Sequence, residues 1–348
     1  MPTASLPRIS ELSLSGTNNY EFKFVGEGAA NVVFKVIEQS DGGNRNRNFQ
    51  GNLLRVPKAG TKAHGYVELQ EYWETVVAPL FSPEDLVQQI LVKLGDEAII
   101  SRLNEALGKE EDNRRPDFRG SRIALAEHAM LVEDMRPNHP DDLCLEFKPK
   151  WLAQSPNAPA SATRCRNCAR KAHQRHTKHG KADKLTILCP LSFLTSTARP
   201  SSLPAILDHL SAPNPPLTPR APTPEQRARL AHWVQTNTLL PRIRAVQLAN
   251  DRGGPLAANA HDLQFQLAMT LRDCTCFVRI PADPSAPVEA KLADLDKKNW
   301  EAKLGYWQTI ERCLIEDGYY EEREQPRQET DCQLGALKDG IRIGDGVE

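Results

Sequence analysis

Residues 21–39 read EFKFVGEGAANVVFKVIEQ, and this stretch constrains the fold more than any other part of the chain. Apolar and polar residues alternate on both sides of the turn GEGAAN, which predicts two strands joined by a glycine-containing hairpin. After a polar loop, LLRVPK predicts a third strand that ends at Lys58. The chain is therefore expected to begin with a small antiparallel sheet.

Helices and further strands are predicted beyond this sheet. Residues 66–108 carry apolar residues three and four positions apart, as amphipathic helices do, and these helices are expected to cover one face of the sheet. The apolar positions are Val67, Leu69, Tyr72, Trp73, Val76, Val77, Leu86, Ile90, Leu91 and Leu94. Apolar stretches short enough for strands lie at 121–135, 143–151 and 274–280, and helical periodicity appears at 224–251, 258–273 and 301–322.

The chain length favours two lobes, because 348 residues are many for one compact core. We expect an α/β (α+β) fold with an N-terminal lobe at 1–133 and a larger, mixed C-terminal lobe at 134–322. The polar and charged tail at 323–348 is expected to be disordered. Prolines concentrated at 199–225 predict a surface insertion that holds only a short helix around ILDHL.

The composition argues against a uniformly charged protein, a membrane-spanning protein and a disulfide-rich secreted protein. Lysine and arginine (44) nearly balance aspartate and glutamate (45), so an anion site must come from local clustering. No run of 18 apolar residues and no signal-like start are present, so we expect an intracellular protein without a membrane partner. The eight cysteines lack secretory context, which favours metal ligation or buried thiols over disulfides.

The glycine hairpin could bind a nucleotide. Glycines between two strands let backbone N–H groups approach phosphate oxygens, as in kinase-type loops, although a plain hairpin would use the same glycines. Arg55 on the predicted third strand lies where kinase-like lobes place the cation that holds the nucleotide phosphates. The chain lacks HRD and DFG, which argues against a protein kinase.

Two lysines follow the predicted strand at 143–147. Lys148 and Lys150 lie on the same face of an extended segment, and Pro149 stiffens the backbone between them. Two fixed ammonium groups suit a multiply charged anion such as a phosphate ester. The alternative is a solvated strand end with ordinary surface lysines.

Acidic residues at element boundaries could hold a metal ion. Asp273 stands at a helix-to-strand step, and Asp294 belongs to ADLDKK. Mg²⁺ prefers one or two carboxylates together with phosphate oxygens and water, while a helix cap or salt bridge is the structural alternative. Lys298 follows, and Lys303 and Tyr306 share a helix face that could extend a basic wall.

The basic segment 164–184 contains a CxxC motif. Cys165 and Cys168, followed by His173 and later by Cys189, supply enough ligands for a tetrahedral zinc site. His176 and His179 are further candidates, and a disordered basic loop with two thiols is the alternative. The basic run could also contact nucleic acid, but no aromatic platform accompanies it, so a nucleic-acid partner is not expected.

Taken together, these motifs resemble the inositol-pentakisphosphate 2-kinases, in particular the fungal members. The resemblance spans about residues 20–320, and LEFKPKW, which matches the family's ExKPK signature, is its most specific piece. The matching pieces are GEGAANVVF, LLRVPK, MLVEDMRP, LEFKPKW, CRNC, LCPLSF, DCTC, and DLDKK followed by KLGYW.

The resemblance implies a two-lobed kinase fold, distantly similar to protein kinases, that phosphorylates the 2-hydroxyl of inositol 1,3,4,5,6-pentakisphosphate with ATP and Mg²⁺. By carry-over, the ATP-binding residues are Gly26, Gly28, Ala29, Ala30, Asn31, Val32, Arg55, Glu133, Met135 and Glu146, with 133–135 as the hinge. Those for the substrate are Arg119, Lys148, Lys150, one or both of Arg170 and Lys171, Lys298, Lys303 and Tyr306. Asp273 is implied as base and Mg²⁺ ligand, Lys148 as a second catalytic residue, and Asp294 as the second Mg²⁺ ligand.

Two other functions are compatible with the same motifs. A non-catalytic inositol-phosphate or nucleic-acid binding protein could retain the same fold, and a kinase could act on a different inositol phosphate. The expected partner is a small-molecule substrate, and a monomer located in the nucleus, the cytoplasm or both is expected.

Overall fold

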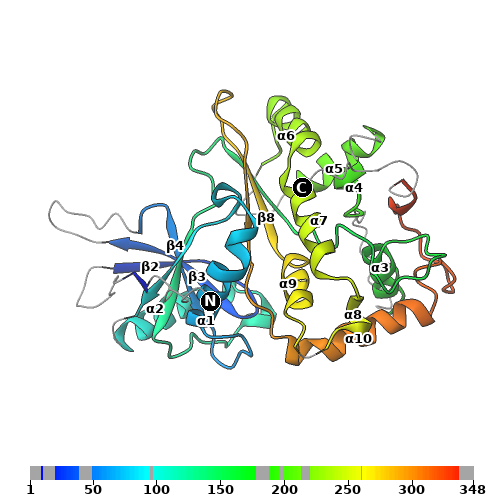
Figure 1. The fold of residues 1–348 in the computed structure, drawn as a ribbon. Helices are drawn as coiled ribbons and strands as arrows, with labels where there is room; N and C mark the ends of the chain where they lie inside the picture. Colours follow the sequence, from blue (N-terminus) through cyan, green and yellow to red (C-terminus); the bar gives the residue numbers. More distant parts are fainter. Residues whose placement is uncertain are drawn as a thin grey trace. The chain divides into compact units, whose positions relative to one another are not determined.

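The computed structural model describes residues 9–10, 20–38, 49–94, 97–177, 188–195, 200–212, 220–259 and 261–336 (Figure 1). The chain divides into two compact units, the first ending at Met135 and the second beginning at Arg136. Each unit combines its own sheet with helices, so the predicted two-lobed α+β class is confirmed. The expected boundary after Glu133 lies close to this division.

The sheet of the first unit is built around the predicted hairpin. Its strands are β1 (Ile9–Ser10), β2 (Tyr20–Glu27), β3 (Asn31–Glu38), β4 (Asn52–Pro57), β5 (Gln89–Lys93) and β6 (His128–Glu133). The spatial order is β1-β5-β6-β4-β3-β2, with antiparallel neighbours except for the parallel pair β1–β5. The three predicted neighbouring strands β2, β3 and β4 are thus confirmed.

Helices cover both faces of this sheet, not one face as expected. Ala129 and Leu131 of β6 belong to the core cluster that includes α2 (Glu97–Lys109), whereas Met130 packs with α1 (Tyr66–Tyr72). Successive side chains of a strand point to opposite faces. The continuous apolar run of β6 therefore needs cover on both sides.

Residues 89–93 form a strand where the spacing of apolar residues predicted a helix. β5 pairs with β6 from Gln89 opposite Val132 to Lys93 opposite His128. A short apolar run satisfies the pattern of a buried strand as well as that of a helix, and the sequence alone does not separate them. Pairing with β6, which lies 35 or more residues away in the chain, decides in favour of the strand.

The second unit contains a smaller antiparallel sheet in the order β7-β8-β9. Its strands are β7 (Leu143–Phe147), β8 (Thr275–Ile280) and β9 (Glu289–Ala293). The helices are α3 (Arg166–Thr177), α4 (Ser192–Thr195), α5 (Leu203–Leu210), α6 (Pro224–Thr236), α7 (Leu239–Asn250), α8 (Gly254–Ala257), α9 (Leu263–Leu271) and α10 (Trp300–Glu316). The strands predicted around β7 and β8 are confirmed, and helices form within each of the predicted ranges 224–251, 258–273 and 301–322.

Residues 224–251 form two helices instead of one. Asn237 ends α6, and its side-chain oxygen accepts a hydrogen bond from the backbone N–H of Leu240 in the first turn of α7. Asparagine competes with the helical backbone for such bonds and so favours helix ends. Short helices complete the fold: a π-helix at Trp73–Val77 and 3₁₀ helices at Ala78–Leu80, Pro83–Asp85, Glu111–Asn113, Pro116–Phe118 and Pro200–Ser202. In the described residues, no helix combines the length and apolar character needed to cross a bilayer.

Two segments expected to lie outside the core contribute to it. In the proline-rich segment, α5 buries Ile206 completely. In the tail, Glu324 is buried in an ion pair with Arg164, and Leu334 is buried too. The expectation of disorder is thus wrong for 323–336, because a buried cation needs a carboxylate partner and the tail supplies it. Residues 213–219 and 337–348 lie outside the described residues.

Candidate active site and cysteine cluster

Three charged residues meet at one edge of the β7-β8-β9 sheet. Lys148 follows β7, Asp273 precedes β8 and Asp294 follows β9. Both outer strands run antiparallel to β8, and Thr275 is registered opposite Ala293. The end of β7, the start of β8 and the end of β9 therefore lie at the same edge, and residues distant in sequence become neighbours.

These residues form a lysine–aspartate cluster together with Lys150 and Lys298. The Lys148 Nζ lies 2.9 Å from Asp294 Oδ2 and 3.4 Å from Asp273 Oδ1. Asp273 also receives the Nζ of Lys150 at 3.0 Å and the Nζ of Lys298 at 3.4 Å. The five side chains are 21–50% exposed, so a dissolved ligand can reach them.

The charges in this cluster shift one another's protonation. Burial raises the pKa of Asp273, but the ammonium groups of Lys298, Lys150 and Lys148 outweigh it and lower this pKa to about 2. Burial lowers the pKa of Lys148, but the carboxylates of Asp294 and Asp273 outweigh it and raise this pKa. Asp273 is therefore ionised and Lys148 is protonated at neutral pH.

Two residues of the cluster have a left-handed backbone. The φ angle is 60° at Lys150 and 56° at Asp294. Residues with a Cβ rarely adopt this region, which costs on the order of 1–3 kcal/mol. Strain of this kind persists where the surrounding fold imposes it and is frequent at functional sites.

Other residues predicted for the substrate lie on helices of the same unit. Arg170 of α3 donates a hydrogen bond to Tyr306 Oη of α10 at 2.6 Å. The contact to Tyr306 thus belongs to Arg170, one of the two alternatives on α3. The other alternative, Lys171, is exposed on α3, and Lys303 is exposed on α10. Glu146 on β7 points away from the core, and desolvation raises its pKa.

The glycines of the first unit's hairpin are not required by the hairpin itself. A Cβ added at Gly26 or Gly28 would meet no atom within 4 Å, and neither residue has a left-handed backbone. Ala29 and Ala30 form the bend that follows. A plain turn would therefore tolerate side chains here, whereas a ligand that approaches the backbone closely would not.

Arg55 lies at the base of this hairpin. β4 places it opposite Val33 of β3. With the Asn31 amide oriented to satisfy its neighbours, the amide oxygen accepts a hydrogen bond from Arg55 Nη2 at 2.7 Å and the nitrogen donates to Tyr66 Oη at 2.8 Å. The guanidinium also lies over the Tyr66 ring, 5.6 Å from its centroid. Asn31 and Arg55, which are separate predictions, are thus joined by a hydrogen bond.

Beneath the hairpin lies a buried ion cluster that sequence reasoning missed. Glu27 lies 2.6 Å from Lys58 Nζ and 2.8 Å from Arg114 Nη2, and all three side chains are at most 3% exposed. The charged groups outweigh the effect of burial and lower the pKa of Glu27. The GEG turn is thereby tied to β4 and to the loop that carries Arg114. No local pattern marks Arg114 as its partner.

The remaining predicted residues of this unit differ in accessibility. Val32 is fully buried in the core, which leaves only its backbone for a ligand, and Met135 is 4% exposed. Glu133 accepts a hydrogen bond from the backbone N–H of Gln88 at 3.2 Å. Arg119 is exposed and donates to two backbone carbonyls of its own loop.

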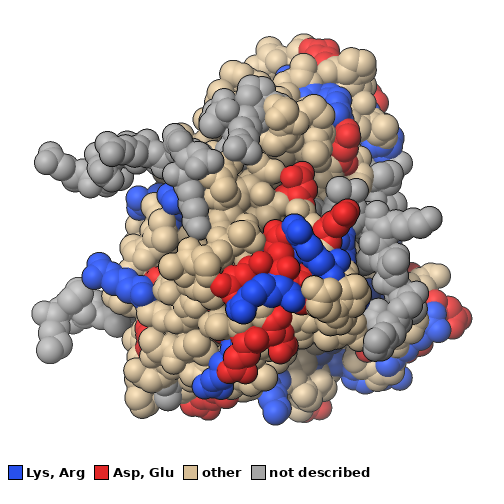
Figure 2. Space-filling model, turned by 90° about the vertical axis from the view of Figure 1, so that its right-hand side faces the viewer, with Lys and Arg blue, Asp and Glu red and all other residues tan. Residues whose placement is uncertain are grey.

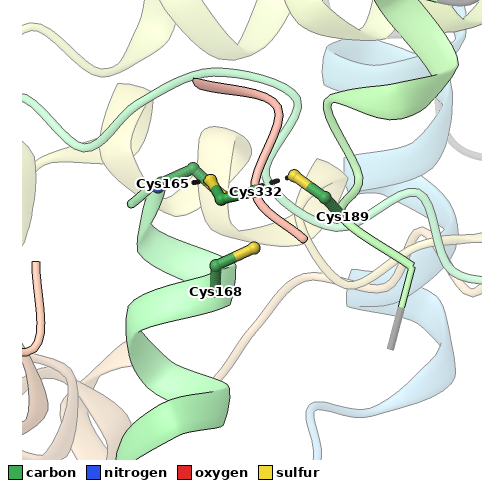
Figure 3. A group of neighbouring side chains, drawn as sticks. All are labelled: Cys165, Cys168, Cys189 and Cys332. Carbon is green, nitrogen blue, oxygen red and sulfur yellow. Dashed lines mark hydrogen bonds between the residues drawn. The ribbon is translucent and has the colours of Figure 1, made fainter. Parts of the chain in front are cut away.

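Four cysteines converge in the second unit (Figure 3). Cys165, Cys168, Cys189 and Cys332 have sulfur atoms within 4.8 Å of one another, and Cys165 Sγ lies 3.8 Å from Cys189 Sγ. A tetrahedral zinc ion with Zn–S bonds of about 2.3 Å would separate its sulfurs by about 3.8 Å. Hydrogen bonds from the other three thiols lower the pKa of Cys332. This donor set fits zinc.

The predicted fourth ligand, His173, is corrected to Cys332. The His173 ring packs against the ring of Tyr319, 5.2 Å between centroids, and is outside the cysteine cluster. Cys332 comes from the tail that was expected to be disordered, and its only sequence signal is that it is a further cysteine. The alternative ligand His179 lies outside the described residues.

The basic run around the CxxC motif has a structural role in its described part. Arg164 pairs with Glu324 at 2.7 Å, and Arg166 pairs with Glu311 at 2.7 Å, with both arginine side chains buried. On the face shown in Figure 2, Lys and Arg side chains lie beside Asp and Glu side chains. Neither observation favours a nucleic-acid surface, which needs accessible positive charge.

Comparisons with known proteins agree with this arrangement. A yeast protein from Yarrowia lipolytica (strain CLIB 122 / E 150), named inositol-pentakisphosphate 2-kinase, is 29% identical over 314 residues. The alignment covers 87% of this chain and 93% of the yeast protein. The family model described as inositol-pentakisphosphate 2-kinase matches residues 24–313, which include the glycine hairpin and the lysine–aspartate cluster. The chain is thus a kinase that belongs to the inositol-pentakisphosphate 2-kinase family.

Proposed function

We propose that the protein transfers the γ-phosphoryl group of ATP to the 2-hydroxyl of inositol 1,3,4,5,6-pentakisphosphate, which gives inositol hexakisphosphate. Family membership supports the reaction class, and the name of the yeast relative supports the substrate. The observation that carries the proposal is the lysine–aspartate cluster. Three ammonium groups around one carboxylate suit a substrate that offers several phosphates and one hydroxyl.

The lysines and Asp273 have different roles in the proposed reaction. Lys148, Lys150 and Lys298 bind phosphate groups as point charges. Asp273, ionised at neutral pH, accepts a hydrogen bond from the 2-hydroxyl and receives its proton as the new P–O bond forms and the bond to ADP breaks. Phosphoryl transfer has a loose transition state, so positioning matters more than the strength of the base.

Mg²⁺ and ATP fit the residues that are present. The Lys148 ammonium already lies between the carboxylates of Asp273 and Asp294, so a cation is favoured there, and both residues would hold Mg²⁺. The bound ion would neutralise charge on the transferred phosphoryl group. In the first unit, the open space beside Gly26 and Gly28 would let ATP phosphates approach the hairpin, and the guanidinium of Arg55 would bind them.

The cysteine cluster would hold a structural zinc ion. Four thiolate ligands leave no open position for substrate or water, which is typical of structural zinc sites. The ion would join α3 to the chain around Cys189 and to the tail around Cys332. Elemental analysis of the purified protein is expected to give about one zinc per chain, and a metal-free protein with native stability would contradict this assignment.

The activity is tested by incubating the protein with ATP, Mg²⁺ and inositol pentakisphosphate. Wild type is expected to form inositol hexakisphosphate, and Asp273→Asn is expected to lower kcat at least about 100-fold, the range of general acid–base effects. Asp262→Asn is the matched control, because this aspartate caps α9 at its other end. Circular dichroism should show that both variants are folded.

The results separate the proposal from its alternatives. Binding of inositol pentakisphosphate without turnover by wild type would favour a non-catalytic binding protein. Phosphate gained at another ring position, or on another inositol phosphate alone, would favour a kinase of different specificity. A near-wild-type rate of Asp273→Asn would remove this residue from the chemistry.

A further inference from the structure

The backbone of Lys150 is held in its left-handed conformation by a neighbouring helix. Its φ of 60° is unfavourable for a residue with a Cβ and needs support from outside the segment. Pro149 precedes it and the buried Trp151 follows. Neither neighbour bonds the backbone of Lys150 into a helix or strand, because β7 ends at Phe147.

Gln247 of α7 supplies this support. Its Nε2 donates to the carbonyl oxygen of Lys150 at 2.9 Å, and its Oε1 accepts from the backbone N–H of Leu152 at 3.0 Å. The same Nε2 lies 3.4 Å from the carbonyl oxygen of Leu271, two residues before Asp273. Gln247 has 0% exposure, so its amide cannot exchange these partners for water.

A second contact from α7 holds the segment that carries Asp273. Asp251, one turn after Gln247, is buried in an ion pair with Arg272. The Arg272 guanidinium carbon lies 3.4 Å from the centre of the Trp151 ring, and that of Arg166 lies 4.1 Å from it. Trp151 is therefore fixed by two cations that each have a carboxylate partner.

These contacts connect the two halves of the lysine–aspartate cluster. Gln247 bonds both the segment of Lys150 and the segment of Asp273, and the Lys150 ammonium lies 3.0 Å from the Asp273 carboxylate. The chain between Lys150 and Asp273 is long, so sequence proximity does not set this distance. The last turn of α7 sets it instead.

We propose that Gln247 is a positioning residue that fixes the Lys150 ammonium relative to Asp273 and thereby sets the affinity for a polyphosphorylated substrate that it never touches. The identity of that substrate rests on the proposed function, but the role of Gln247 in fixing Lys150 relative to Asp273 does not. Loss of the three amide contacts would release the Lys150 backbone toward ordinary φ values and turn its side chain away from Asp273.

The test replaces Gln247 with methionine, which keeps the length of the side chain and removes its hydrogen bonds. The first readout is the rate at which acetic anhydride acetylates Lys150, followed by mass spectrometry with the exposed Lys303 as internal reference. Loss of its ion pair is expected to raise the relative rate for Lys150 about two- to fivefold. The second readout is steady-state kinetics, where KM for inositol pentakisphosphate is expected to rise about tenfold and KM for ATP to change less than about twofold.

Gln266→Met is the matched control. Gln266 is a buried glutamine on the neighbouring helix α9, and its side-chain oxygen has no hydrogen-bond partner among the described residues. The control therefore shows how much stability is lost when a buried glutamine of this core is replaced by methionine. Melting temperatures of both variants identify any general loss of fold.

Each outcome decides the proposal. A structural role alone would lower the melting temperature and the active fraction, hence kcat, and leave the KM for inositol pentakisphosphate and the acetylation of Lys150 unchanged. That result would overturn the proposal, as would equal changes in Gln266→Met. If wild type neither binds nor phosphorylates inositol pentakisphosphate, the proposed function fails, and the acetylation rate of Lys150 alone decides whether Gln247 positions it.

Discussion

At the scale of single residues, the charge balance around Asp273 defines the candidate site. Its carboxylate is paired with three lysines, which together lower its pKa more than burial raises it. The sequence indicated each of these residues, because Lys148 and Lys150 alternate in a segment that was predicted to be extended and Asp273 stands at a helix-to-strand step. It could not indicate that they touch, since more than 120 residues separate the lysine pair from the aspartate.

The lowered pKa of Asp273 predicts a pH dependence of stability. A carboxylate with a depressed folded-state pKa contributes stability that is fully present above its ordinary pKa of 3.8 and is lost as the pH falls toward about 2. We therefore expect the difference in free energy of unfolding between wild type and Asp273→Asn to be constant above about pH 5 and to shrink below about pH 4. Urea unfolding across this range measures it. A difference that stays constant down to about pH 3 would contradict the assigned pKa shift.

At the scale of elements, the hairpin of β2 and β3 combines an open turn with a rigid base. Its glycines face open space, while Glu27 between them is buried with Lys58 and Arg114. The alternation in the sequence predicted the hairpin. The buried ion cluster beneath it depends on Arg114, which lies 87 residues after Glu27, and has no local signal.

This arrangement predicts separate effects on folding and binding. Gly28→Ala is expected to leave the melting temperature unchanged or slightly raised, because the backbone and its surroundings accept a Cβ. The same change is expected to raise KM for ATP about tenfold, since the methyl group keeps phosphate oxygens from the backbone N–H groups. Steady-state kinetics with varied ATP measure this effect.

Gly65→Ala is the matched control for this prediction. Gly65 also has open surroundings and an ordinary backbone, but it precedes α1 and lies outside the hairpin. An unchanged KM for ATP in Gly28→Ala, or an equal change in Gly65→Ala, would favour the plain-turn interpretation of the hairpin.

At the scale of the whole molecule, the C-terminal tail completes the core of the second unit. Cys332 joins the cysteine cluster, and Glu324 neutralises the fully buried Arg164. The composition of the tail predicted disorder because it is charged and poor in apolar residues. The prediction from composition fails here because the core already contains the partners of the tail, which are a buried arginine and three thiols.

The tail is therefore expected to depend on the metal. Cys332→Ser should lower the zinc content and raise the hydrogen-exchange rates of 323–336 at least about tenfold, because a lost ligand weakens the only four-thiol site among the described residues. Cys313→Ser is the control, since Cys313 lies on α10 and its thiol contacts Asp317 instead of the cluster. Slow exchange of 323–336 in zinc-free protein would show that the ion pair of Arg164 alone holds the tail.

The local features of this protein could be predicted from the order of its residues. Periodicity gave the hairpin, the strands around β7 and β8 and most helices, and the order of the motifs identified the family, because such patterns depend on neighbours along the chain. Three features became visible in the fold alone: residues 89–93 form a strand, Cys332 takes the place of His173 beside the other three cysteines, and Gln247 bonds both the segment of Lys150 and the segment that leads to Asp273. These features depend on contacts between segments far apart in sequence, and burial and hydrogen bonding there outweigh local preference.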